Sequence, residues 1–363
     1  MNNATSSPSN NHVAIWLFTC CIFIFLMVAI GGLTRLTESG LSITQWKPVS
    51  GILPPFSTHA WQEEFAKYQQ SPEYLKKNLG MSLEEFKGIF WLEFIHRLVG
   101  RVTGFIFLVP LVYFLIKKQI SKPLALKLGG IFALGGSQGV VGWYMVKSGL
   151  QDAPHVSQYW LAFHFGMALV IYGMVFWSGL GIREKGKKEK REKVAEGNNQ
   201  DNSVNSSSLH PLLPYSLILL IAIFIQSILG AFVAGTHAGL IYNTFPDMNG
   251  QYVPDGLFVM SPWYINFFEN TTTIQFTHRM FAYFVTALIL IFYCFSRKFS
   301  LTTTVKCAIG LLPVVITVQL ALGIFTLLGQ VPVMLASLHQ IFAVVLFTAV
   351  LFITHELRRG ARG

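Results

Sequence analysis

Eight long apolar runs divide this sequence, and they constrain the fold more than any other feature. They lie near residues 13–33, 89–116, 124–146, 158–180, 211–234, 273–296, 304–328 and 334–356. Each is close to the roughly 20 residues that an α-helix needs to cross about 30 Å of hydrocarbon. None shows the strict alternation of a barrel strand, so helices are the economical interpretation. The sequence therefore predicts an all-α integral membrane protein with eight transmembrane helices.

The basic residues indicate how these helices are oriented. The formal net charge is +10, and Lys and Arg gather around 117–127, 183–193 and 297–306 and at the C-terminus. By the positive-inside rule these segments face the cytoplasm, which places both termini inside and the loop 34–88 outside. The charge pattern thus points to membrane lipid and not to nucleic acid as a partner. The polar start MNNATSSPSNNH carries no Lys or Arg, which favours a bacterial cytoplasmic (inner) membrane over an organelle.

The two halves of the chain resemble each other. Three matches recur in the same order: EFIHR at 93–97 with QFTHR at 275–279, Gln138/Gly142 with Gln319/Gly323, and His164 with His339. Because four helices separate the matched elements, both halves should have the same orientation in the membrane. We therefore expect two pseudo-symmetric four-helix bundles.

The segment 183–210 separates these halves. It is first charged and then rich in Asn and Ser, a composition typical of a disordered linker. The predicted domains are an N-terminal bundle over 1–182, a cytoplasmic linker over 183–210 and a C-terminal bundle over 211–363.

Four histidines fall inside predicted membrane helices: His96, His164, His278 and His339. The other six, His12, His59, His155, His210, His237 and His355, lie in loops or at helix ends. At about 1.5 Å per residue, the four lie at a similar depth, roughly 10 Å below the outer boundary. A single intramembrane histidine commonly makes only an interhelical hydrogen bond. Four at matching depth, two in each bundle, favour ligation of two centres instead.

Haem is the centre that these residues fit best. Zinc and di-iron sites want three or more ligands, often carboxylates, which are scarce inside the predicted helices. A haem macrocycle supplies four donors and needs only two imidazoles. Seven glycines would let a flat ring approach the backbone: Gly100, Gly104, Gly135, Gly136, Gly139, Gly142 and Gly166. Arg97, Arg101 and Arg279 are candidates for contact with haem propionates, with snorkelling to lipid phosphate as the alternative.

The two bundles differ at one acidic position. Glu93 precedes His96 by three residues and shares its helix face, whereas Gln275 holds the matching place before His278. This difference predicts that the first bundle handles protons while the second only moves electrons. The alternative is that Glu93 is a boundary acid solvated by water.

Over nearly its whole length the chain resembles the haem A synthase family. The resemblance is carried by Gly31-Gly-Leu-Thr-Arg-Leu-Thr-Glu-Ser-Gly-Leu-Ser42 with Trp46-Lys-Pro48, by Glu93-Phe-Ile-His96-Arg97, by His164-Phe-Gly166, by Thr277-His278-Arg279 and by Leu338-His339-Gln340. One branch of the family has two cysteines in the first outer loop. This chain has none between 34 and 88, so it resembles the cysteine-free branch.

The resemblance implies an enzyme that oxidises the C8 methyl of haem O to a formyl group, through an alcohol and a hydrated aldehyde. The product, haem A, serves terminal oxidase assembly. By position, His278 and His339 would ligate the iron of a haem B cofactor. His96 and His164 would hold the iron of the substrate haem O, with Glu93 as the catalytic acid.

The implied partners are haem O synthase and an electron donor, for which a ferredoxin-like protein is one candidate; a homo-oligomer stays open. Two other functions fit the residues alone. A dihaem b-type electron-transfer protein would contain two similar haems and alter neither. A transporter built from a four-helix repeat would use the histidines in a proton path and contain no haem.

Overall fold

The computed structural model describes residues 10–45, 50–149, 156–196 and 210–360. Within them eight helices are long and apolar enough to cross a membrane, which confirms the predicted fold class. They are α1 (Asn10–Leu36), α4 (Leu83–Ile116), α5 (Lys122–Gly149), α6 (Gln158–Glu196), α7 (Leu213–Gly235), α9 (Thr271–Ser296), α10 (Thr303–Leu328) and α11 (Val333–Gly360). The described residues form no strand beyond one isolated bridge between Met248 and Gln251.

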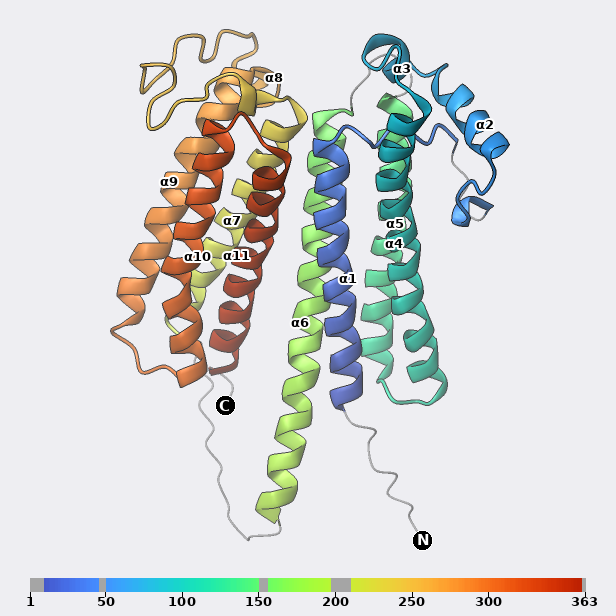
Figure 1. Ribbon diagram of the computed structural model, residues 1–363. Coiled ribbons are helices and arrows are strands. Elements are labelled where there is room, and N and C mark those ends of the chain that lie inside the picture. Colours follow the sequence, from blue (N-terminus) through green and yellow to red (C-terminus); the bar gives the residue numbers. More distant parts are fainter. Residues whose placement is uncertain (1–9, 46–49, 150–155, 197–209, 361–363) are drawn as a thin grey trace.

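The long helices form two groups of four (Figure 1). In the first, contacts run α1–α4–α5–α6 and back to α1, and in the second they run α7–α9–α10–α11 and back to α7. Contacts of α6 with α7, of α1 with α11 and of α6 with α11 join the groups. This order is compatible with the predicted repeat, in which α7 corresponds to α1 and α11 to α6.

Two helices extend beyond their apolar runs. Helix α4 begins at Leu83 instead of 89, because Ser82 and Glu85 form a capping box at its first turn. Helix α6 continues through the basic run to Glu196, so the prediction of a disordered linker is wrong for 183–196. Arg, Lys and Glu, which are frequent in this run, are good helix formers. Residues 197–209 lie outside the described residues, as do Trp46-Lys-Pro48 and His155.

Short helices cover the ends of both groups on one face of the molecule (Figure 1). They are η1 (Ser50–Ile52), α2 (Thr58–Tyr68), α3 (Pro72–Lys76), η2 (Ala238–Leu240), η3 (Trp263–Ile265) and α8 (Asn266–Glu269). Buried Tyr68 and Tyr74 pack on Phe86, Phe90 and Phe94 of α4. The loop between α1 and α4, predicted to lie outside, is thus a folded cap anchored to the helix that carries His96.

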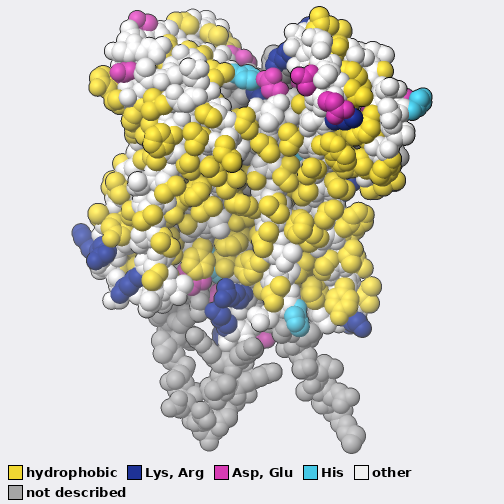
Figure 2. All heavy atoms as spheres, viewed as in Figure 1, with side chains coloured by type: hydrophobic (Ala, Val, Ile, Leu, Met, Phe, Trp, Pro, Cys, Tyr) yellow, Lys and Arg dark blue, Asp and Glu magenta, His cyan; other side chains and the backbone are white. Residues whose placement is uncertain are grey.

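The surface separates into bands (Figure 2). On the face in view, apolar side chains cover the middle of the molecule, acidic side chains gather toward the capped face, and Lys and Arg gather at the opposite end. Helix α1 begins and helix α11 ends at that basic end (Figure 1). The apolar band matches the part of a membrane protein that lies in hydrocarbon.

Candidate functional site

Each bundle brings two histidines together. His96 of α4 and His164 of α6 come from helices at opposite corners of the first bundle, and their rings are near enough to interact electrostatically. His278 of α9 and His339 of α11 are paired in the same way in the second bundle. All four rings are half-buried. The predicted division into two pairs therefore has a geometric counterpart.

A glycine of a neighbouring helix faces each ring: Gly31 faces His96, Gly142 faces His164, Gly230 faces His278 and Gly323 faces His339. A Cβ at Gly230 would lie 3.2 Å from His278 Cε1, and one at Gly323 would lie 2.8 Å from His339 Cε1. A Cβ at Gly323 would therefore displace the His339 ring, and one at Gly230 would press against the His278 ring.

Only Gly142 among the seven glycines singled out in the sequence lies against a histidine. Gly104, Gly135, Gly136 and Gly139 would meet open space. The sequence did contain a signal for two further glycines that face a ring, Gly230 and Gly323. Like Gly142, each follows a glutamine by four residues. That spacing places glutamine and glycine on the same helix face.

These glutamines contact the same histidines. Gln138 donates to the backbone oxygen of His164 at 3.0 Å, and Gln226 donates to that of His278 at 3.1 Å. The third contact runs from His339 Nδ1 to the carbonyl oxygen of Gln319, 3.1 Å away. Because a carbonyl can only accept, Nδ1 of His339 carries the proton and Nε2 is left as the metal-binding nitrogen.

The residues present fit a haem better than a metal ion alone. Within the described residues no group of three or more His, Cys, Asp and Glu is placed to hold a metal ion. Each bundle offers two imidazoles from facing helices instead. Buried polar atoms without a hydrogen-bond partner occur on these same residues, namely His164 Nδ1 and the side-chain oxygens of Gln138, Gln226 and Gln319. Two axial nitrogens are the donor set that a haem iron needs.

Glu93 is buried, and its carboxylate is fully hydrogen-bonded. Oε2 accepts from Ser42 Oγ at 2.6 Å and from the Ile43 backbone N–H at 2.8 Å, while Oε1 accepts from Arg97 Nε at 3.0 Å. Arg97 also donates to the Ile43 carbonyl at 3.1 Å. Glu93 therefore joins α4 to the segment that follows α1, and water does not solvate it as the alternative reading required.

The second bundle repeats this arrangement with an amide. Gln275 and Arg279 both donate to the carbonyl oxygen of Tyr242, at 2.9 and 2.8 Å. Arg279 also donates to the carbonyls of Thr244 and Asp247, at 3.0 and 2.9 Å. In both bundles, the arginine after the histidine ties its helix to the connection that follows α1 or α7. The carboxylate of Glu93 is the difference.

The three arginines proposed as propionate contacts therefore differ in their surroundings. Arg97 and Arg279 are engaged by Glu93 and by loop carbonyls. Arg101, one turn deeper on α4, is half-buried and near enough to Arg97 for their charges to repel. The propionate role stays a prediction for all three.

One polar contact links the two ring pairs. Gln340, next to His339 on α11, donates to the Val28 carbonyl of α1 at 2.8 Å. A Cβ on Gly32 would collide with the Gln340 amide. Because Gly31 of the same helix faces His96, this contact helps to hold the two sites at a constant separation.

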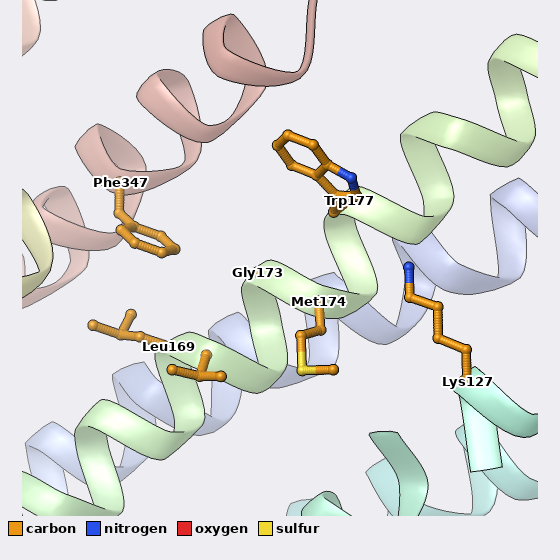
Figure 3. A pocket seen from close by; sticks show the side chains of 7 residues that line it. Lys127, Leu169, Gly173, Met174, Trp177 and Phe347 are labelled. Atoms are coloured by element: carbon orange, nitrogen blue, oxygen red, sulfur yellow. The ribbon is translucent and has the colours of Figure 1, made fainter. Parts of the chain in front are cut away.

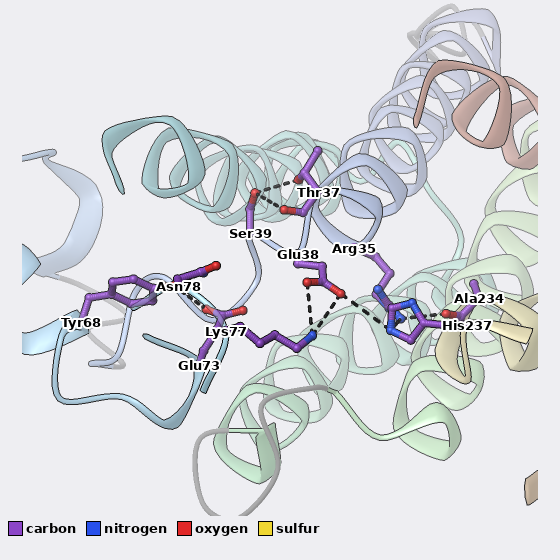
Figure 4. A network of polar contacts seen from close by, with 10 residues as sticks. All are labelled: Arg35, Thr37, Glu38, Ser39, Tyr68, Glu73, Lys77, Asn78, Ala234 and His237. Atoms are coloured by element: carbon purple, nitrogen blue, oxygen red, sulfur yellow. Dashed lines mark hydrogen bonds and ion pairs between the residues drawn. The ribbon is translucent and has the colours of Figure 1, made fainter. Parts of the chain in front are cut away.

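A polar network also joins the bundles at the capped face (Figure 4). Arg35 of α1 donates to the Ala234 carbonyl at 2.7 Å and lies 3.0 Å from His237 Nε2. Glu38 pairs with Lys77 of the outer loop at 3.2 Å and lies 3.7 Å from His237. His237, which looked like an ordinary loop residue, is therefore part of the contact between the halves.

Glu73 is a second buried acid in the outer loop (Figure 4). The Tyr68 hydroxyl donates to its carboxylate at 3.1 Å and accepts from the Asn78 amide at 2.7 Å. Burial raises the pKa of Glu73 to about 7, because a charged carboxylate loses hydration inside the cap. Glu93 is also near enough for its negative charge to raise the pKa of Glu73.

Comparison with known proteins gives consistent matches across the chain. The profile of a family described as cytochrome oxidase assembly protein matches residues 14–351. A haem A synthase of Nitrosospira multiformis is 51% identical over 96% of this chain and 94% of its own. One of Nitrosomonas eutropha is 44% identical over 98% of this chain and 99% of its own. A haem A synthase of Arabidopsis thaliana is 45% identical over 96% of this chain and 75% of its own.

Proposed function

Because this chain belongs to the haem A synthase family of cytochrome oxidase assembly proteins, we propose how its two bundles divide the oxidation of haem O to haem A. The reaction is that of a haem-dependent membrane oxidoreductase. Its relatives are named for this synthesis, and a simple dihaem electron carrier has no such support. The observation that supports this division is that Glu93 and Gln275 occupy matching positions in the two bundles, but only Glu93 is an acid.

The second bundle holds haem B in this proposal. His278 and His339 would hold the iron of this cofactor, and the Nδ1–H of His339, bonded to the Gln319 carbonyl, orients its ring. No acid stands at Gln275, and the nearby bonds go to backbone carbonyls. When bound, the cofactor supplies electron-transfer chemistry, which suits a site without a titratable neighbour.

The first bundle holds the substrate. His96 and His164 would hold the iron of haem O, whose C8 methyl is the group to be oxidised. Glu93 takes up or returns protons as this methyl is oxidised to the formyl level. Arg97 holds the acid in place, and the folded outer cap excludes bulk water from it. Glu73 then provides a second acid near Glu93, inside the folded cap.

The test of this function is the pigment that the protein makes. A bacterial strain that makes haem O but lacks its own haem A synthase should gain haem A when this chain is expressed. Extracts with haem O unchanged, from membranes that contain the folded protein, would contradict the proposal. Purified protein with two unaltered b-type haems would instead favour the electron carrier.

For location, we propose the bacterial inner membrane with both termini cytoplasmic. The basic end of the molecule, where α1 begins and α11 ends, supports this orientation. A reporter that is active only in the cytoplasm should be active when fused after Gly363. Activity of a periplasmic reporter at that point would invert the orientation.

Gly323→Ala is expected to disturb the haem B site without unfolding α10. The added Cβ would lie 2.8 Å from His339 Cε1, so the ring must turn away from its bond to Gln319. We expect a shifted haem B absorption spectrum and reduced haem B content in the purified protein. Gly310→Ala is the matched control, because it lies on the same helix with nothing within 4 Å of its Cβ position. Equal spectra for the two variants would show that Gly323 does not shape the site.

A further inference from the structure

An apolar groove lies where the two bundles meet (Figure 3), along the half of α6 that runs away from the cap. Its volume is about 270 Å³. Leu169, Gly173 and Trp177 of α6 line it, together with Phe347 of α11 and Lys127 of α5. The groove thus draws on both bundles, and it belongs to neither histidine pair.

The length of the groove suits one leaflet of a bilayer. From Leu169 to Trp177 the helix rises by about 12 Å at 1.5 Å per residue, close to the roughly 15 Å of half a hydrocarbon core. Trp177 lies toward the basic end, where an aromatic side chain commonly marks the membrane boundary. An acyl chain lying along Gly173 would therefore reach toward the bilayer centre.

Two cations converge at the boundary end of this groove. The Lys127 side chain extends toward Trp177 (Figure 3), and the Arg358 guanidinium lies 5.7 Å from the Trp177 ring. The two charges are near enough to repel each other. The nearest acid on α11, Glu356, lies 3.7 Å from His355, and no ion pair joins Lys127 or Arg358 to an acid within the described chain. An anionic group between these cations would remove the repulsion.

A second apolar hollow offers an internal comparison. It has a volume of about 430 Å³ and is lined by Trp16, Thr19, Phe105, Val109 and their neighbours on α1 and α4. No cationic side chain lines it. A hollow of this kind can accept any acyl chain, so a preference for charge is expected only at the groove between the bundles.

We propose that an anionic phospholipid of the cytoplasmic leaflet binds this groove. One acyl chain lies against Leu169, Gly173 and Phe347, and the headgroup phosphate lies between Lys127 and Arg358. Basic pockets between membrane helices on the cytoplasmic side recognise lipid headgroups in this way. Because α6 and α11 both line the groove, the lipid would also brace the contact between the two bundles.

The test is native mass spectrometry of the full-length protein, titrated with phosphatidylglycerol or with phosphatidylcholine of the same acyl chains. We expect the protein to bind phosphatidylglycerol tightly and phosphatidylcholine more weakly. Lys127→Gln and Arg358→Gln should each weaken phosphatidylglycerol binding roughly fivefold, the effect of one cation near an anionic lipid. Lys122 is an exposed cation in the first turn of α5, the helix that carries Lys127. Lys122→Gln should leave phosphatidylglycerol binding unchanged.

Two substitutions that fill a hollow test whether the lipid preference comes from this groove or from the general charge of the surface. Val170, 45% exposed, also lines the groove, and Val109, 62% exposed, lines the comparison hollow. Val170→Phe should remove the preference for phosphatidylglycerol, whereas Val109→Phe should preserve it. Equal binding of the two lipids by the unsubstituted protein would overturn the proposal. So would equal effects of Lys127→Gln and Lys122→Gln.

Discussion

His278→Ala and His339→Ala are each expected to yield a membrane protein that contains little or no haem B. Either change removes one of two axial nitrogens, and the half-buried site has no third histidine among its described neighbours to replace it. Haem content of the purified protein, from its absorption spectrum and from extracted pigment, is the measurement. We expect more than tenfold loss, because the outer partners of a metal ligand alone are typically worth 10- to 100-fold in affinity.

The control for general damage is His59→Ala, since the His59 side chain is 80% exposed in the outer loop. It should retain full haem B. Elution of the two site variants as monodisperse protein in detergent would show that the helices still assemble. Full haem B with an unchanged spectrum in both variants would refute the assignment of this pair.

Glu93→Gln is expected to reduce turnover by roughly 10²- to 10⁴-fold, the usual cost of losing a general acid or base. The fold should survive, because Gln275 already occupies the corresponding position beside Arg279 in the second bundle. Arg97 should also keep its bond to the Ile43 carbonyl. The measurement is haem A in membranes that contain equal amounts of each variant, where haem O or its alcohol should accumulate.

Ser42→Ala separates proton handling from anchoring of the outer connection. It removes the 2.6 Å bond from Ser42 to Glu93 but leaves the titratable carboxylate and its ion pair with Arg97 in place. If Glu93 handles protons, Ser42→Ala should lower haem A yield far less than Glu93→Gln. If Glu93 only anchors this segment, the two variants should behave alike. Near-normal yield from Glu93→Gln would end the catalytic proposal.

The helices and the candidate ligands were predictable because both depend on local or repeated patterns. A membrane excludes unpaired backbone groups, so eight apolar runs of sufficient length leave little choice but helices. The start of α4 also depends on a local pattern, the capping residues Ser82 and Glu85. The end of α6 was misjudged for a related reason: a charged segment was read as disordered by composition, although its residues favour a helix.

The chemical neighbours of each ligand could not be read in the same way. Glu93 and His96 share a helix face, yet the Glu93 carboxylate bonds to Ser42, Ile43 and Arg97. That choice depends on where the segment after α1 crosses α4. Sequence spacing describes only one helix and says nothing of the segment packed against it.

By itself the sequence determined the membrane class, the helix number, the division into halves and the four histidines that stand out within the helices. The tertiary structure alone decided that Gly31 faces the His96 ring, that Gln340 links the two sites and that Lys127 meets Arg358 beside Trp177. The physical reason is that helix formation depends on hydrogen bonds within one segment. Contacts between helices depend instead on how side chains of distant segments pack, and the same apolar surfaces allow several packings.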